Sequence, residues 1–505
     1  MLDVSVQSGV PESTVADVLA LFITDPPELS AAASALNERL QGRLRQLVED
    51  GEIKGQLGHV ALVHTRGELA AHRLALVGVG KPPKLDADSL RTAASRVVTR
   101  LRGIGGGTIA WCLDPSLDLD PTQQARSLTE GTALASFDHG RWKTIEPRPK
   151  EIEALVLVSE RTDELAELEA AAHRAARTCR WTNRCRELVD APANELTPAE
   201  LASAAESIAN ELAGLSCEVW GPEEIRAAKM GALDAVGRGS ANPPRLITVR
   251  WEPEEAPDSP VLGLVGKAIT FDTGGISIKP SARMADMKTD MGGGAAVVGA
   301  MGAIAELTMP IRVVGVVPAA ENMPDGHAYR PGDIIMARNG KTIEVTNTDA
   351  EGRLILADAL THCRELGATH MLDFATLTGA CVVALGDFFA GLLGNDSDWV
   401  ARVQAAAAAS GDHAWELPLH DTYRRHIGST FADFKNASDL RQAGPIYAAS
   451  FLAEFVGEGP WAHLDIAGTA YLNRTRGDYF TGAGATGYGV RLAAELASAL
   501  AAADA

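Results

Sequence analysis

Short apolar runs alternate with longer stretches of helical periodicity along most of the chain. Near the N-terminus, residues 29–50 and 89–104 carry apolar positions spaced three and four apart, which is the pattern of an amphipathic helix. The short runs, which are typical of β-strands, cover residues 59–65, 73–80, 108–113 and 153–159. Because strands that are separated by helices pack into a parallel or mixed sheet, this part of the chain is predicted to form an α/β domain.

A long, charged and alanine-rich segment follows, from about residue 163 to residue 189. Its good helix formers and its apolar period near 3.6 predict one continuous helix that connects two domains. Two prolines break this pattern, and Thr197, Pro198 and Glu200 then resemble the start of a new helix. Beyond this point strand-like runs again alternate with helices, at residues 245–251, 261–266, 311–318, 370–376 and 461–468.

We therefore predict two α/β domains of unequal size. The smaller domain covers residues 1–165, a connecting helix covers residues 166–190, and the larger domain covers residues 191–505. The total of 505 residues is about three times the size of a typical domain of about 150 residues, so the length alone gives two domains as the first expectation and leaves a third open.

Composition and charge limit the classes of protein to which the chain can belong. With 46% hydrophobic and 22% charged residues, its composition is that of a globular protein. Asp and Glu number 66 against 46 Lys and Arg, and the net charge of −20 repels phosphate backbones and anionic lipids. Nucleic acid is therefore not an expected partner.

The sequence also indicates where the protein acts. It contains no run of 18 uncharged apolar residues, so we expect no membrane span. The N-terminus does not have the basic and apolar regions of a signal peptide. The six cysteines are scattered, without the paired spacing of a zinc site or the density of a disulfide scaffold. We expect a cytoplasmic protein with reduced, buried thiols.

Residues able to do chemistry concentrate in three short segments, residues 266–280, 287–297 and 347–360. In the first segment, two apolar runs end at Lys267 and Asp272. In the second segment, Asp290 precedes three glycines and an apolar helical pattern. In the third segment, Asp349 and Glu351 follow a strand-like run and precede a helix, which is where α/β sheets place their ligand sites.

Four carboxylates in one pocket require a counter-charge, because like charges a few ångströms apart repel strongly. One divalent ion would neutralise two carboxylates and two ions would neutralise all four, so their number favours a two-metal site. The alternative is that they are surface or helix-capping residues in separate places. Two basic residues in the same segments, Lys279 and Arg353, favour a common site.

The three segments described above, together with residues 321–333, 373–381 and 461–470, resemble the cytosol or leucyl aminopeptidase family, the M17 metallopeptidases. The octapeptide NTDAEGRL, at residues 347–354, is by itself close to a family signature. The order and spacing of the segments match as well, and the resemblance extends over residues 185–490.

This resemblance implies a fold and a set of metal ligands. The N-terminal domain is expected to be macro-like, and the C-terminal catalytic domain to have a central mixed sheet flanked by helices. Two divalent metal ions per subunit are expected, with manganese or zinc first and cobalt or magnesium as alternatives. One ion would be held by Lys267, Asp272, Asp290 and Glu351, and the other by Asp272, Asp349 and Glu351.

The resemblance also implies a reaction. A metal-activated hydroxide would attack the peptide carbonyl of a short peptide with a free N-terminus and release its first residue, preferentially leucine or another apolar residue. Lys279 would stabilise the oxyanion, and Arg353 would hold a bicarbonate that acts as general base. This fits the sequence, since none of the twelve histidines lies in the metal-bearing segments.

Other expectations come from the same resemblance. Met287, Thr376, Gly379 and Ala467 would line the pocket for the first side chain of the substrate, and the protein would be a homohexamer. The chain departs from the family at Ala268, where glycine usually follows the ligand lysine.

Two other functions stay open at this point. Clustered carboxylates also suit a metal-dependent phosphoesterase, although basic phosphate-binding residues are scarce around the three segments. Some members of the family bind DNA as regulators, but the net charge of −20 argues against this role here.

Overall fold

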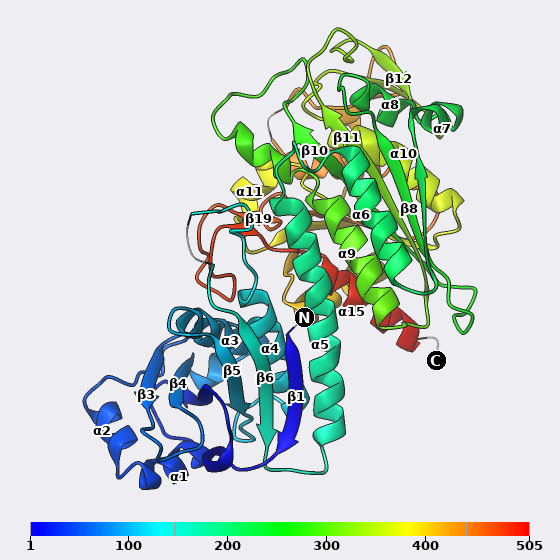
Figure 1. Cartoon of the computed structure of the whole chain (residues 1–505). Helices are drawn as coiled ribbons and strands as arrows, with labels where there is room; N and C mark the ends of the chain where they lie inside the picture. The colour runs from blue at the N-terminus through cyan, green and yellow to red at the C-terminus, as the bar shows by residue number, and fades with distance from the viewer. Residues whose placement is uncertain (1, 146–147, 441, 504–505) are drawn as a thin grey trace. The chain divides into compact units, whose positions relative to one another are not determined.

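The computed structural model describes residues 2–145, 148–440 and 442–503. The chain folds into two compact units, one of Met1–Arg180 with Arg474–Ala483 and the other of Trp181–Asn473 with Gly484–Ala505 (Figure 1). The division falls inside helix α5 (Leu165–Asp190), at the place of the predicted connecting helix. The predicted fold class, two α/β domains with mixed sheets, is confirmed.

The first unit is built on a six-stranded sheet with the strand order β1-β6-β5-β2-β4-β3. All neighbouring strands are parallel except the β3–β4 pair. The strands are β1 (Asp3–Ser8), β2 (Val18–Thr24), β3 (Val60–His64), β4 (Arg73–Gly80), β5 (Gly107–Cys112) and β6 (Ile152–Ser159). The helices are α1 (Ala31–Arg39), α2 (Arg43–Glu49), α3 (Ala87–Arg102), α4 (Pro121–Ala135) and the first part of α5, with 3₁₀ turns η1 (Pro11–Ser13) and η2 (Pro82–Lys84).

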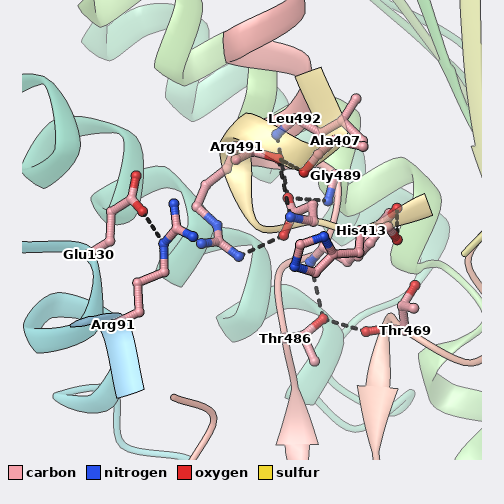
Figure 2. Close-up of polar contacts among 12 residues, drawn as sticks. Arg91, Glu130, Ala407, His413, Thr469, Thr486, Gly489, Arg491 and Leu492 are labelled. Atoms are coloured by element: carbon pink, nitrogen blue, oxygen red, sulfur yellow. Dashed lines mark hydrogen bonds and ion pairs between the residues drawn. The ribbon is translucent and has the colours of Figure 1, made fainter. Parts of the chain in front are cut away.

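Strand β2 shows why this unit has three layers. Its side chains alternate between two cores, so that Val18 and Phe22 pack with α3, α4 and α5, while Leu19 and Ile23 pack with α1 and α2. Both faces of the sheet are therefore covered by helices, as is usual for a parallel sheet. The buried ion pair between Arg91 and Glu130, 2.5 Å long, joins α3 to α4 (Figure 2).

The structure corrects the prediction of a single helix over residues 29–50. The chain forms two helices there, α1 and α2, because Gln41 (φ 54°) and Gly42 (φ 84°) lie in the left-handed region, which ends a helix. By contrast, the predicted helix start after residue 196 is confirmed. Thr197 caps α6 by accepting a hydrogen bond from the main-chain N–H of Glu200, with Pro198 at the first helical position.

The second unit contains a nine-stranded mixed sheet with the order β16-β15-β18-β14-β9-β11-β8-β7, in which β10 also pairs with β11. Its strands are β7 (Leu215–Trp220), β8 (Arg245–Trp251), β9 (Val261–Gly266), β10 (Ala268–Asp272), β11 (Arg312–Asn322), β14 (His370–Ala375), β15 (Ala390–Gly394), β16 (Ala414–Glu416) and β18 (Trp461–Asp465). Two small sheets contain β12 (Ile334–Met336), β13 (Thr342–Glu344) and β17 (Phe434–Lys435), and β19 (Tyr471–Leu472) and β20 (Gly484–Ala485).

Helices cover both faces of this large sheet (Figure 1). On β11, Val313 and Val317 enter the core shared with α6, α9, α12 and α15, whereas Val314 and Val316 enter the core shared with α7, α8, α10 and α14. The helices are α6 (Pro198–Glu211), α7 (Pro222–Ala227), α8 (Gly231–Gly237), α9 (Gly292–Glu306), α10 (Gly352–Glu365), α11 (Gly379–Leu385), α12 (Ser397–Ser410), α13 (Asp421–Arg424), α14 (Gly444–Leu452) and α15 (Val490–Ala503), with 3₁₀ helices η3 (Met284–Thr289) and η4 (Arg425–Ile427).

A buried carboxylate fixes the start of the last helix, α15. Asp412 accepts hydrogen bonds from the main-chain N–H groups of Gly489 at 3.0 Å and Leu492 at 3.4 Å, and it pairs with Arg491 at 2.7 Å (Figure 2). Both members of the pair are buried, so the charge of each depends on the other.

Strands β9, β11, β14 and β18 run parallel to one another, so their carboxyl ends meet at one edge of the large sheet. Ligand sites of α/β proteins lie at this edge. Among the described residues, no helix is long and apolar enough to cross a membrane.

Candidate metal centre

Polar side chains gather at the carboxyl ends of these neighbouring strands. Lys267 directly follows β9, Asp272 is the last residue of β10, and Asn322 is the last residue of β11. Thr376 follows β14, and Asp465 is the last residue of β18. The sheet therefore brings together residues that are up to about two hundred positions apart in the chain.

Two helix starts supply the remaining carboxylates. Asp290 ends η3 just before α9, while Asp349 and Glu351 lie just before α10. The glycines after Asp290 allow this close approach, because a Cβ atom on Gly293 would lie only 2.0 Å from the carbonyl oxygen of Phe374 on β14. The start of α9 can therefore pack directly against the sheet, and Asp290 lies beside the strand ends.

Lys267 is at the centre of one half of the site. Its Nζ lies 2.7 Å from Asp290 Oδ2 and 2.9 Å from Glu351 Oε1, and it donates a hydrogen bond to the carbonyl oxygen of Thr376 at 3.0 Å. Thr376 in turn donates its hydroxyl to Asp290 Oδ1 at 2.7 Å. The side chain of Lys267 is 3% exposed, so these contacts form away from solvent.

Lys279 occupies the other half. Its Nζ lies 2.8 Å from Asp272 Oδ2 and also pairs with Asp349. This side of the site is more open, because the side chains of Lys279 and Asp349 are 22% and 31% exposed. The structure thus brings all five predicted metal ligands and Lys279 into one cluster.

The charges of the cluster do not balance among its own residues. Four carboxylates face two ammonium groups, and burial raises the pKa of Asp290 to about 8 and that of Asp272 to about 6. Burial alone would lower the pKa of Lys267, but Asp290, Glu351 and Asp272 together raise it above its ordinary value. The excess of carboxylates over ammonium groups and the burial of Asp290 and Asp272 together describe a site that a divalent cation would stabilise.

The donor set fits divalent cations. Asp272, Asp290 and Glu351 each offer an oxygen atom, and these atoms lie within 4.8 Å of one another. Oδ2 of Asp290 and Oδ1 of Asp349 are buried and have no hydrogen-bond partner among the described residues, although Asp290 Oδ2 forms an ion pair with Lys267 and Asp349 Oδ1 forms one with Lys279. Carboxylate oxygens of this kind bind magnesium, manganese and zinc.

Arg353 is the second residue of α10 and is half-buried, with its Nε buried. Nη1 donates a hydrogen bond to the carbonyl oxygen of Asn436 at 2.8 Å, while Nε has no hydrogen-bond partner among the described residues. Burial lowers the pKa of Arg353 to about 10. A guanidinium with a free donor can bind an anion.

The four residues predicted to line a substrate pocket fall into two groups. Thr376 and Met287 lie against Asp290, since Thr376 bonds to its side chain and Asp290 donates its N–H to the Met287 carbonyl oxygen at 3.4 Å. Gly379 and Ala467 lie near Asp465, which accepts the N–H of Ala467 at 3.2 Å and the hydroxyl of Thr378, the residue before Gly379, at 2.6 Å. A Cβ atom on Gly379 would meet no atom within 4 Å, so space is open there.

Three further residues have structural roles. Ala268 lies in β10, is not among the positive-φ residues of the described chain, and is buried in the core, so its methyl group causes no backbone strain. His463 pairs through Nδ1 with Asp373 at 2.6 Å inside the sheet. Cys381 is buried, as the sequence predicted, and burial raises the pKa of its thiol to about 12.

Two residues at the site were missed in the sequence. Asn322 donates a hydrogen bond to Asp272, and Asp465 organises the loops after β14 and β18. Both end apolar strands, as Asp272 does, and this shared position was the signal that could have identified them.

Comparison with known families agrees with this geometry. The profile described as the cytosol aminopeptidase family, catalytic domain, matches residues 183–494, and the N-terminal domain of the same family matches residues 18–146. The chain belongs to the cytosol aminopeptidase family. It is therefore an aminopeptidase of a metal-dependent hydrolase family, and this assignment favours peptides over phosphoesters as substrates.

Similar proteins support the assignment over nearly the full length. The chain is 42% identical to a probable cytosol aminopeptidase of Roseiflexus castenholzii, over 97% of each chain. It is 46% identical to a probable cytosol aminopeptidase of Solibacter usitatus, over 89% of this chain and 92% of the relative.

Two solved structures share its fold. A mutant of tomato leucine aminopeptidase superposes with a TM-score of 0.89 at 32% identity, covering 99% of this chain and 97% of the other. The bottromycin maturation enzyme BotP in complex with Mn superposes with a TM-score of 0.84 at 34% identity, covering 96% of this chain and 100% of the other.

Proposed function

We propose that this protein is a dinuclear-metal aminopeptidase that removes leucine and other apolar residues from the N-terminus of short peptides. The observation that carries the proposal is the cluster of four carboxylates and two lysines at one sheet edge, where negative charge is in excess. Family membership supports the reaction class, and the cluster supports the number of ions.

The proposed ligands form two groups, because some contact Lys267 in the buried half of the cluster and others contact Lys279 in the open half. Lys267, Asp290, Asp272 and Glu351 would hold one ion in the buried half, and Asp272, Asp349 and Glu351 would hold the other in the more open half. Lys267 would bind as the neutral amine, because an ammonium has no free electron pair, and two dications beside it would lower its pKa. When bound, two divalent ions supply Lewis-acid chemistry, in which they polarise the peptide carbonyl and lower the pKa of water. The Mn-bound BotP structure supports manganese as one usable metal, with zinc, cobalt or magnesium as alternatives.

The other charged residues act directly on the substrate. Oδ2 of Asp290 accepts no hydrogen bond within the described chain and would bind the free α-amine of the substrate, which explains why only an N-terminal residue is released. Lys279, on the open side, would stabilise negative charge that develops on the carbonyl oxygen. Arg353 would hold a bicarbonate through its free Nε donor, and this anion would accept the proton of the attacking water.

The preference for leucine rests on the space beside Asp290. Met287 and Thr376 lie against Asp290, and the small residues Gly379 and Ala467, near Asp465, would leave room for a branched aliphatic side chain that extends from Asp290 toward them. Short peptides, a homohexameric assembly and action in the cytosol are part of the same proposal; the names of the relatives support the cytosol, whereas the peptide length and the assembly rest on the resemblance described above.

The test is hydrolysis of leucine p-nitroanilide by the full chain, stripped of metal and then supplied with Mn²⁺ or Zn²⁺. We expect cleavage only with metal, and no cleavage of the N-acetylated substrate, because that compound has no amine for Asp290. Cleavage of the acetylated compound at a similar rate would refute the role of the free amine. Preference for alanine or arginine over leucine p-nitroanilide would refute the proposed specificity.

A further inference from the structure

Asn322 lies between the two halves of the cluster and is fully buried. Its Nδ2 donates hydrogen bonds to Asp272 Oδ1 at 2.8 Å and to the carbonyl oxygen of Thr348 at 3.0 Å, and it lies 3.5 Å from Glu351 Oε2. One amide group thus connects the end of β10 with the loop before α10.

The orientation of this amide is fixed by its surroundings. All three groups around Nδ2 are oxygen acceptors, so the NH₂ end must face them, and the opposite Oδ1 atom accepts no hydrogen bond within the described residues. Gly275 leaves room for that oxygen, since a Cβ atom there would lie 2.7 Å from Oδ1. The main chain of Asn322 is held as well. Its carbonyl oxygen accepts two hydrogen bonds from Thr273, one from the main-chain N–H at 3.0 Å and one from the hydroxyl at 2.7 Å.

The two carboxylates that Asn322 contacts are the two that both ions would share. Asp272 and Glu351 belong to both sites of the proposed function, on which this inference rests. The two ligands that belong only to the buried half are held by Thr376 and not by Asn322. The Thr376 hydroxyl donates to Asp290, and the Thr376 carbonyl oxygen accepts a hydrogen bond from the amine of Lys267. Asp349 is the one ligand of the open half that is not shared, and its side chain is 31% exposed.

We propose that Asn322 is a positioning residue that sets the placement of the two shared carboxylates relative to each other, and thereby the affinity for the second, more exposed divalent ion. Without this amide, the buried half still has Lys267 and Asp290 in place. The open half has only Asp349 besides the two carboxylates that have lost their common donor. The loss of Asn322 therefore weakens the second ion far more than the first.

The experiment is a titration of the metal-stripped full chain with Mn²⁺, followed by calorimetry and by metal analysis after dialysis. For the Asn322→Ala variant we expect the tighter binding event to stay within about threefold of the parent chain. The weaker event should lose about 10- to 100-fold in affinity, which is the usual cost of removing a residue that orients a metal ligand. Electron paramagnetic resonance gives a second readout, because a coupled Mn²⁺ pair at two equivalents should be replaced by the signal of single ions.

Two variants serve as controls. Thr376→Val removes the hydroxyl that orients Asp290 and should weaken the tighter event instead of the weaker one. Asn37→Ala removes a buried amide of the first unit, which accepts the N–H of Arg45 at 3.1 Å, and should leave both events unchanged. If Asn322→Ala does not fold, as judged by circular dichroism, Asn322→Ser tests the same idea, because it keeps a shorter donor.

The outcomes separate this inference from the function on which it rests. A parent chain that binds fewer than two ions would refute the dinuclear proposal itself. A parent chain that binds two ions, with Asn322 variants that bind both as tightly or lose both equally, would refute only the role of Asn322.

Discussion

The position of the Lys267 amine can be tested by adding one methyl group at Gly352. This glycine is the first residue of α10, and a Cβ atom there would lie 2.6 Å from Cε, 2.7 Å from Cδ and 2.8 Å from Nζ of Lys267. Carbon atoms in contact are normally about 3.5–4.0 Å apart, so Gly352→Ala must push the lysine side chain away by about 1 Å.

A displacement of this size is enough to break the short contacts that hold the Lys267 amine. Nζ lies 2.7 Å from Asp290 Oδ2, 2.9 Å from Glu351 Oε1 and 3.0 Å from the Thr376 carbonyl oxygen. A retreat of about 1 Å takes Nζ out of hydrogen-bond range of some of these atoms. We expect kcat/KM to fall about 100-fold, or about 2.7 kcal/mol, because a misplacement of this size at a reacting centre costs about that much. The fold should survive, since alanine is favoured over glycine in a helix by up to about 1 kcal/mol.

The assay is hydrolysis of leucine p-nitroanilide at saturating Mn²⁺, with thermal unfolding measured on the same sample. Gly326→Ala is the control, because Gly326 is an exposed loop residue at which an added Cβ atom meets nothing within 4 Å. It should have the activity and the Tm of the parent chain.

A folded Gly352→Ala protein with unchanged kcat/KM would refute the argument. It would show that the amine can move by about 1 Å without effect, and that Lys267 does not hold a catalytic ion. Equal losses in the Gly352 and Gly326 variants would instead show that either change disturbs the protein in general.

Three further predictions concern other parts of the second unit. Asp412→Ala should lower the free energy of unfolding by about 3–5 kcal/mol in urea titrations, because it removes a buried carboxylate that pairs with Arg491 and accepts two main-chain N–H groups at the start of α15; a change below about 1 kcal/mol would contradict the importance of these contacts. Burial, with Arg338 nearby, lowers the pKa of His362 to about 4, so the unfolded chain binds the proton first as pH falls below about 6.5 and stability is lost down to about pH 4. At pH 5 the free energy of unfolding should be about 2 kcal/mol lower than at pH 7, and in a His362→Gln variant this decrease should be smaller by about 2 kcal/mol. If the free energy of unfolding of both proteins falls in parallel with pH, the lowered pKa of His362 is disproved. Because burial raises the pKa of Cys381 to about 12, iodoacetamide at pH 7.5 should not inactivate the native enzyme, and rapid inactivation prevented by Cys381→Ala would show that this thiol is accessible.

The strands and helices that were predicted followed from the local pattern, but several features of the first unit did not, among them strand β2 and the break between α1 and α2. Strand β2 is buried on both faces, so it reads as a continuous apolar run, and such a run has no period that distinguishes it from a helix. The break between α1 and α2 depends on a left-handed conformation at Gln41 as well as at Gly42. A glutamine at that position gives no sequence signal for a turn.

The candidate site was predicted in more detail than the fold, because its residues lie in compact motifs. Lys267, Asp272 and Lys279 are close in sequence, and so are Asp349 and Glu351. Asn322 and Asp465 could not be placed in the same way. Their roles depend on β9 lying between β11 and β14, and on β18 lying beside β14, which is a property of the sheet order and not of any short segment.

The way the site is assembled has a consequence for biosynthesis. Its residues come from strand ends between Lys267 and Asp465, and these strands become neighbours only when β9, β11, β14 and β18 have all joined the sheet. A nascent chain that has not yet released β18 from the ribosome lacks one border of the site. The five proposed ligands all lie before β14, whereas Thr376, which bonds to Asp290, and Asp465, which organises the neighbouring loops, come later in the chain; metal should therefore bind the finished second unit more tightly than a chain that ends before β14, and should stabilise the finished fold.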